Sequence, residues 1–264
     1  MKRFLAAAAL MALLAGCVAQ GEPLQRGDVR PAGPPATEGG GSDWAPVDKA
    51  EVRPGVPIHT EKRDCPSNFL FERADHTSVF LGSTAYCFRD MPVGTLVTVG
   101  GPENIGLLVY SSWQTMQEVG EQDADARNYN DFAVVRMDQS ARAKESPALA
   151  GIVGPTGMAE PSSIGLGARV KQFVNDPTLP QWRDAIVTGK ASEWAFLTYS
   201  PLPPVPGQMG GGVVDENGKA LGVIVSLGVS PNPGANGVAR LDTLMKYADE
   251  HAKLYMSLVP APSS

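Results

Sequence analysis

The side chains that could carry out nucleophilic catalysis are few in this sequence of 264 residues. A hydroxyl or thiol nucleophile needs a neighbouring base that accepts its proton near neutral pH, and histidine fills this role most often. The chain has three histidines, His59, His76 and His251, and none stands in a recognisable motif with a serine. No His, Cys, Asp or Glu residues occur at the spacing of metal ligands. We therefore expect neither a metal site nor a cofactor.

The composition favours a turn-rich β protein over a helical bundle, because the chain contains 29 glycines and 23 prolines. Hydrophobic residues make up 43% of the chain and charged residues 19%, which is ordinary for a globular protein. The formal net charge is −6 at pH 7. A role in binding nucleic acid has no electrostatic support at this charge.

The N-terminus has the pattern of an export signal. A basic pair precedes the apolar run Phe4–Leu14, which is too short to span a bilayer core of roughly 30 Å. Leu14-Ala15-Gly16-Cys17 resembles the lipobox at which bacterial lipoproteins are cleaved. We therefore expect a signal peptide over residues 1–16 and stable membrane anchoring through acyl chains, palmitate among them, on Cys17. The alternative is an ordinary secretory signal with a chance cysteine.

Residues 17–62, from the lipidated cysteine onward, are predicted to form a disordered tether. They are rich in glycine and proline, and their few apolar residues show no period, so little core could form. Trp44 has no predicted place in this segment. The tether would hold a folded part, residues 63–258, in the bacterial cell envelope, on the outer side of the cytoplasmic membrane or on an outer membrane.

The sequence pattern changes after residue 63. Short apolar runs separated by Gly, Pro and Asp predict β-strands there. The predicted strands are Asn68–Arg73, Thr77–Gly82, Thr95–Val99, Gly106–Tyr110, Phe132–Arg136, Val170–Val174, Arg183–Thr188, Ala195–Tyr199, Gly211–Asp215 and Leu221–Ser226. Asn217-Gly218 predicts a hairpin turn between the last two strands. Apolar residues at helical spacing between Leu241 and Tyr255 predict one terminal helix. This pattern favours an all-β sandwich or a pair of barrels.

Four segments resemble, in the same order along the chain, sequence blocks of the trypsin- and chymotrypsin-like serine proteases of the bacterial secreted branch. They are Gly82-Ser83-Thr84-Ala85-Tyr86-Cys87, Asn130–Arg136, Gly207–Val214 and Gly222–Gly228. The resemblance implies an all-β fold of two six-stranded antiparallel β-barrel lobes with a C-terminal α-helix. The lobes would occupy about 63–148 and 149–240, and the helix about 240–256.

The resemblance also implies a disulfide between Cys65 and Cys87, because the family commonly bridges these two places. Export to an oxidising compartment would permit this bridge, and closing the loop would stabilise the fold by roughly 3 kcal/mol. The alternative is a pair of unpaired buried thiols.

The catalytic positions that the resemblance implies hold Tyr86, Asp131 and Met209, in place of the family's His, Asp and Ser. A phenol with an ordinary pKa near 10 is not a general base at neutral pH. A thioether has no proton to lose and cannot form an acyl-enzyme. We therefore expect a degenerate triad and no enzymatic activity.

The rest of the site keeps residues that could bind without reacting. By resemblance, the backbone N–H groups of Gly207 and Met209 would form an oxyanion-hole-like site, and Ser226, Leu227 and Gly228 would pair with an extended peptide. Gln208 replaces an aspartate of the family, which leaves the order of this loop open. The alternative is that these residues remain only because the fold needs them.

Three functions are compatible with this sequence. The first is a membrane-anchored, non-catalytic serine protease homologue that binds a peptide or protein outside the cytoplasmic membrane. The second is an active trypsin-like endopeptidase with an atypical site, and the third is a purely structural surface lipoprotein. The expected partners are the membrane, through the lipid on Cys17, and a peptide or protein ligand, whereas nucleic acid is not expected. The sequence gives no indication of the oligomeric state.

Overall fold

The computed structural model describes residues 44–138, 143–160, 164–174, 181–202, 207–227 and 234–262. All of them belong to one compact unit. The predicted signal peptide, the lipidation site Cys17 and the cleft residue Gly228 lie outside the described residues. Within the described part of the chain, no helix is long and apolar enough to cross a membrane.

The first lobe is an antiparallel sheet with the strand order β14-β3-β4-β7-β6-β5-β1-β2. It contains β1 (Pro57–His59), β2 (Asp64–Pro66), β3 (Leu70–Arg73), β4 (Val79–Ser83), β5 (Leu96–Val99), β6 (Gly101–Ser111), β7 (Ala133–Met137) and β14 (Met256–Leu258). The β3–β4 hairpin pairs Leu70 with Leu81 and Phe71 with Phe80. These four side chains are fully or almost fully buried, so this hairpin forms part of the core of the lobe.

The second lobe is a closed six-stranded barrel with the strand order β10-β13-β12-β11-β8-β9. Its strands are β8 (Arg169–Phe173), β9 (Trp182–Lys190), β10 (Ala195–Tyr199), β11 (Gly212–Asp215), β12 (Ala220–Ser226) and β13 (Ala235–Arg240). The predicted Asn217-Gly218 turn joins β11 to β12, with Gly218 at a φ of 75°. Asp215 Oδ1 stabilises the turn by accepting hydrogen bonds from Asn217 N at 2.9 Å and Lys219 N at 2.8 Å.

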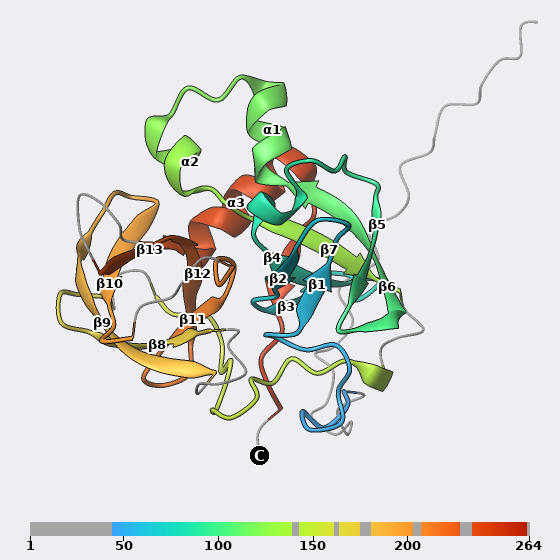
Figure 1. The fold of residues 1–264 in the computed structure, drawn as a ribbon, viewed down its shortest axis with the longest axis horizontal. Coiled ribbons are helices and arrows are strands. Elements are labelled where there is room, and N and C mark those ends of the chain that lie inside the picture. The colour runs from blue at the N-terminus through green and yellow to red at the C-terminus, as the bar shows by residue number, and fades with distance from the viewer. Residues whose placement is uncertain are drawn as a thin grey trace, which may run out of the picture. The chain divides into compact units, whose positions relative to one another are not determined.

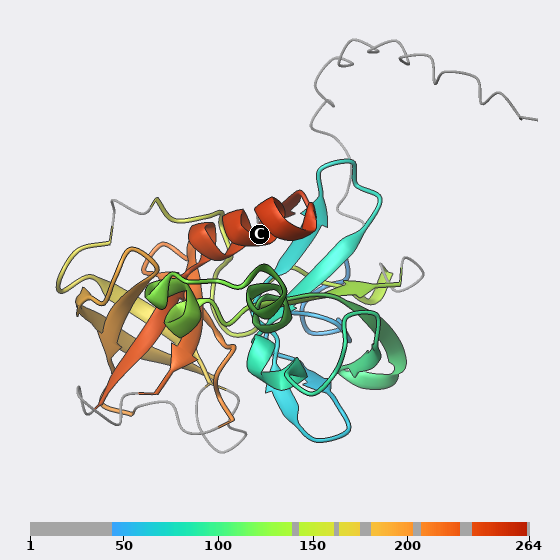
Figure 2. The same ribbon diagram turned by 90° about the horizontal axis from the view of Figure 1, so that it is seen from above.

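The observed architecture confirms the all-β class and the two lobes with a C-terminal helix, α3 (Leu241–Ala252). The two lobes lie side by side, and α3 runs from one toward the other (Figure 1 and Figure 2). One detail differs from the prediction: the first lobe is an eight-stranded open sheet, whereas the second is the closed six-stranded barrel. Three strands of this sheet, β1, β2 and β14, were not predicted from the sequence pattern.

Two further helices were missed by the prediction of one terminal helix. They are α1 (Ser112–Val119) and α2 (Ala124–Tyr129), and a 3-10 turn, η1 (Ala85–Phe88), lies in the first lobe. Gly120, at a φ of 65°, ends α1, and Asp123 caps the start of α2 by accepting from Asp125 N at 2.9 Å. At eight and six residues, α1 and α2 are too short to show a clear helical period.

The folded unit begins earlier than the predicted boundary at residue 63. Val52, Val56 and Ile58 are buried in the first lobe, and Trp44 packs against the same apolar cluster. Strand β1 pairs with both β2 and β5. The predicted tether is therefore too long at its C-terminal end, because its sparse apolar residues complete the core of a sheet formed by later strands.

Candidate functional site

Tyr86 and Asp131 are brought together by hydrogen bonds to the backbone of η1. Thr84 caps η1 and donates its hydroxyl proton to Asp131 Oδ2. The backbone N–H of Tyr86 donates to Asp131 Oδ1 at 2.8 Å and more weakly to Thr84 Oγ1 at 3.3 Å. Asp131 lies between α2 and β7, so the first lobe alone positions both residues.

Burial is the main influence on the Asp131 carboxyl, and it raises the pKa of this group above its ordinary value. Hydrogen bonds from Thr84 and from the backbone of Tyr86 and Ala85 act in the opposite direction, as does the positive charge of Arg89. The donors stabilise the ionised form but do not fully offset the loss of solvation.

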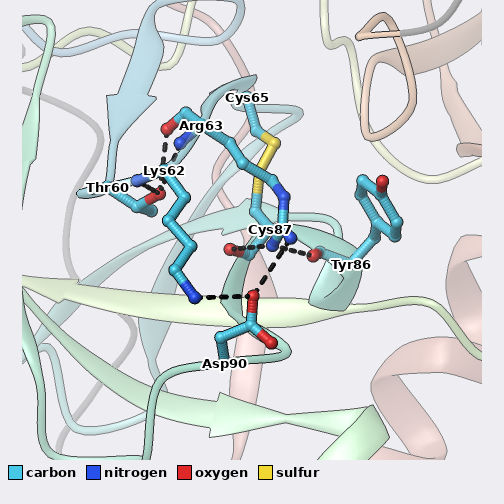
Figure 3. A network of polar contacts seen from close by, with 7 residues as sticks. All are labelled: Thr60, Lys62, Arg63, Cys65, Tyr86, Cys87 and Asp90. Carbon is cyan, nitrogen blue, oxygen red and sulfur yellow. Dashed lines mark hydrogen bonds and ion pairs between the residues drawn. A yellow bond between two sulfur atoms is a disulfide. The ribbon is translucent and has the colours of Figure 1, made fainter.

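The side chain of Tyr86 contacts arginines. The residue is 44% exposed, and the guanidinium carbons of Arg63 and Arg89 lie 4.9 Å and 5.3 Å from its ring centroid. Arg63 donates to the carbonyl oxygen of Tyr86 at 3.1 Å and to Asp90 Oδ2 at 3.1 Å (Figure 3). Within the described residues, the phenol makes no hydrogen bond to Asp131, so the side chain does not take the place of a base held by that carboxylate.

The predicted bridge between Cys65 and Cys87 is confirmed. It joins β2 to η1, with the two Cα atoms 6.3 Å apart, and both cysteines are buried. Figure 3 shows the bridge beside Arg63 and Tyr86. The disulfide therefore fixes the backbone on which Tyr86 stands, next to the segment that supplies Arg63.

Met209 lies on a loop of the second lobe that contacts the Tyr86 segment. The loop bends at Gly207 and Gly210, whose φ angles are 92° and 98°. Gly210 N donates to Ile224 O at 2.8 Å, and the Gly210 carbonyl accepts from Asn68 Nδ2 at 3.3 Å. A Cβ atom on Gly210 would lie 2.9 Å from Thr84 Cγ2. The residue after Met209 thus touches the residue two before Tyr86, which brings the two predicted segments together across the lobes.

The predicted oxyanion-hole-like residues lie on the Met209 loop, whereas the predicted cleft residues lie at the end of β12. Within the described residues, no backbone acceptor takes the N–H of Gly207 or Met209, and Gln208 beside them is buried. Ser226 Oγ accepts from Gly237 N at 3.1 Å, while Leu227 packs against the apolar core of the barrel. Gly228 falls outside the described part of the chain, so the structure places two of the three predicted cleft residues.

The histidines do not reach this site. His59 interacts with Asp64 at 2.8 Å and His76 with Glu72 at 2.7 Å, both at the surface of the first lobe. His251 lies on α3, where its ring centroid is 4.2 Å from that of Tyr247. The described residues contain no group of three or more His, Cys, Asp or Glu side chains that could hold a metal ion.

A small cavity opens beside Tyr86 and Asp131. Its volume is about 160 Å³, and its lining includes Arg89, Trp113 and Arg127. Sequence reasoning missed these three residues, because Trp113 and Arg127 stand on the two helices that were not predicted and Arg89 stands in no motif. The chain therefore adds aromatic and cationic groups to a position where the resemblance implies catalytic chemistry.

No protein-family model matches the chain, and no curated protein matches it in sequence. Solved structures do match. Thermobifida fusca protease A aligns over 79% of this chain and 98% of its own, with a TM-score of 0.51 and 17% identity. The Nocardiopsis protease aligns over 78% and 98%, with a TM-score of 0.50 and 16% identity. Cellulomonas bogoriensis chymotrypsin aligns over 79% and 98%, also with a TM-score of 0.50 and 16% identity.

The fold is that of the chymotrypsin-like serine proteases. In this chymotrypsin-like fold, Tyr86 and Asp131 come from the first lobe and Met209 from the second. Their segments meet where Gly210 contacts Thr84. The segments that carry Tyr86, Asp131 and Met209 therefore lie together where the two lobes meet.

Proposed function

We propose that this protein is a non-catalytic serine protease homologue that binds a peptide or protein tail and is held outside the cytoplasmic membrane by lipid on Cys17. The observation that carries the proposal is the environment of Asp131. Its carboxylate is bonded to the backbone of Tyr86 and to Thr84, while the Tyr86 ring contacts Arg63 and Arg89. An acid that orients a base in a triad has no base to orient here.

The chemistry of the substituted groups supports inertness. Tyr86 offers a phenol, a group whose ordinary pKa is near 10 and which is a poor general base at neutral pH. Met209 offers a thioether, which cannot give up a proton or form an acyl intermediate. Loss of either the serine or the histidine in a well-studied protease lowers kcat by about 2 × 10⁶.

Peptide binding is supported by the backbone that surrounds these groups. Gly207 and Met209 have N–H groups with no backbone acceptor among the described residues. Strand β12 reaches Ser226, two residues beyond Ile224, whose backbone N–H and carbonyl bond to Gly211 and Gly210 in the segment before β11. A strand that extends past its neighbour can pair with an added peptide through main-chain hydrogen bonds.

Two measurements on the full-length protein in detergent test this proposal. A fluorophosphonate probe should leave the protein unlabelled while labelling an active chymotrypsin-like protease in the same tube. Stoichiometric labelling that maps to any serine of the chain would show an atypical active endopeptidase instead. Labelling with a fatty-acid probe should be lost in Cys17→Ala, and labelling of that variant would rule out the proposed anchor.

A further inference from the structure

The cavity beside Tyr86 contains an unusual arrangement of arginine and aromatic side chains. The guanidinium carbon of Arg89 lies 5.3 Å from the ring centroid of Tyr86 and 5.0 Å from that of Trp113. Both aromatic residues are partly exposed, at 44% for Tyr86 and 41% for Trp113. Contact with aromatic faces orients a guanidinium group and leaves its N–H donors available at the ring edges.

The cavity is lined by more cationic than acidic side chains. Arg63 is paired with Asp90, which also pairs with Lys62. The guanidinium groups of Arg89 and Arg127 line the cavity and make no hydrogen bond or ion pair within the described residues, although Arg89 lies close enough to Asp131 for its charge to lower the pKa of that carboxyl. Asp131 is the acid in the lining, but its oxygens already accept from Thr84 and Tyr86. Two cations are thus available in a chain whose formal net charge is −6.

The remaining lining suits one apolar group. Met116 and Val225 contribute apolar surface beside the Trp113 ring. The volume of about 160 Å³ is close to the roughly 150 Å³ of a protein cavity that binds benzene. Asn130 also lines the cavity and is buried. Its side-chain amide is close to the Tyr110 hydroxyl but makes no well-aligned hydrogen bond within the described residues.

We propose that this cavity binds the C-terminal residue of a peptide, with the α-carboxylate at Arg89 and Arg127 and an apolar side chain against Trp113, Met116 and Val225. A C-terminal residue carries its carboxylate and its side chain on the same carbon, so one residue supplies both groups that the cavity can hold. Guanidinium groups bind a carboxylate through charge-assisted hydrogen bonds. The inference rests on the proposed peptide-binding function and names the ligand class and the residues that select it.

The probe is the peptide acetyl-Gly-Gly-Gly-Leu, prepared as the free acid and as the C-terminal amide. Isothermal titration of the full-length protein in detergent should show that the acid binds at least 10-fold more tightly than the amide. Arg89→Gln and Arg127→Gln should each weaken binding of the acid by about 10-fold or more, because each removes a charge-assisted hydrogen bond. Arg136→Gln, which changes an exposed arginine of β7 outside this cavity, is the matched control and should bind as the wild type does.

The outcomes separate this inference from the proposed function. Equal binding of acid and amide to the wild type would overturn the carboxylate site, and this comparison does not depend on the folding of any variant. NMR spectra recorded during the same titration locate the bound peptide. If the peptide perturbs the signals of Gly207 and Met209 but not those of Arg89, the protein binds peptides and the proposed Arg89–Arg127 site is wrong. If neither peptide binds at millimolar concentration, both proposals fail. Binding of free leucine as tightly as the peptide would identify a small carboxylate as the ligand and overturn the peptide terminus.

Discussion

At the residue scale, the carboxylate of Asp131 has a structural role. Its two oxygens accept hydrogen bonds from the Thr84 hydroxyl and the Tyr86 backbone, and these bonds tie η1 to the start of β7. Burial raises the pKa of Asp131, so the folded protein binds this proton more tightly than the unfolded chain does. A stability cost at neutral pH follows, because the folded state must bury an ionised group.

We predict that the stabilising contribution of Asp131 declines as the pH rises. The free energy of unfolding contributed by a group with a raised folded pKa is fully present below its unfolded pKa, ordinarily near 4, and is lost as the pH rises through the folded value. Asn at this position cannot titrate. The difference in unfolding free energy between the wild type and Asp131→Asn should therefore fall from pH 4 upward, by no more than about 1.4 kcal/mol per pH unit. Urea unfolding of both proteins at several pH values measures it, and a difference that grows with pH would contradict the prediction.

The resemblance identified Tyr86, Asp131 and Met209 from short sequence blocks, because such blocks report the residue type directly. It could not report how the Tyr86 side chain lies. That orientation depends on Arg63 and Arg89, whose contacts arise only after β2 and η1 pack together. The sequence could not identify Arg127 as a site residue for another reason. It is an exposed arginine on a six-residue helix, which is too short to show a helical pattern of apolar residues.

At the scale of elements, the strands were predictable wherever apolar runs were bounded by turn residues. The β3–β4 and β11–β12 hairpins were found in this way. Strand β1 was missed, because Pro57–His59 supplies only one buried side chain, Ile58, and gains its place by pairing with β2 and β5. A short strand of this kind is stabilised by its tertiary partners and not by its own sequence.

The loop that holds Met209 depends on Gly210, which must adopt a φ of 98° and approach Thr84 closely. We predict that Gly210→Ala lowers the free energy of unfolding by about 2–4 kcal/mol, because backbone strain adds to a steric clash. Gly94 has a φ of 97°, and a Cβ atom added to it would meet nothing within 4 Å. Gly94→Ala should therefore report the strain alone, at about 1 kcal/mol. Equal losses in the two variants, measured by chemical denaturation, would show that the contact with Thr84 contributes nothing.

At the scale of the whole folded unit, two connections join the lobes in addition to the contacts of Gly210 with Asn68 and Thr84. The segment between α1 and α2 reaches the second lobe and α3, where Glu121 Oε2 accepts from the Tyr247 hydroxyl at 3.0 Å and Asp123 Oδ2 accepts from Trp194 Nε1 at 3.2 Å. The second connection is the C-terminal segment. Helix α3 packs on β12 and β13 of the barrel, and β14 then pairs with β3 of the first lobe. Figure 2 shows α3, in red, running from the barrel toward the first lobe.

This second connection predicts that β14 stabilises both lobes. Met256 of β14 is buried in the apolar cluster that contains Phe71 of β3 and Leu244 of α3, whereas the neighbouring Ser257 is exposed. Met256→Asp should lower the free energy of unfolding by about 3–5 kcal/mol, since it removes a buried apolar side chain and places a carboxylate in its position. Ser257→Asp introduces the same carboxylate on the solvent side of the same strand and should change stability by about 0.5 kcal/mol or less. Thermal and urea unfolding of the wild type and both variants measure these changes in the free energy of unfolding. If the two substitutions have the same effect, β14 is not part of the core and does not help to join the lobes.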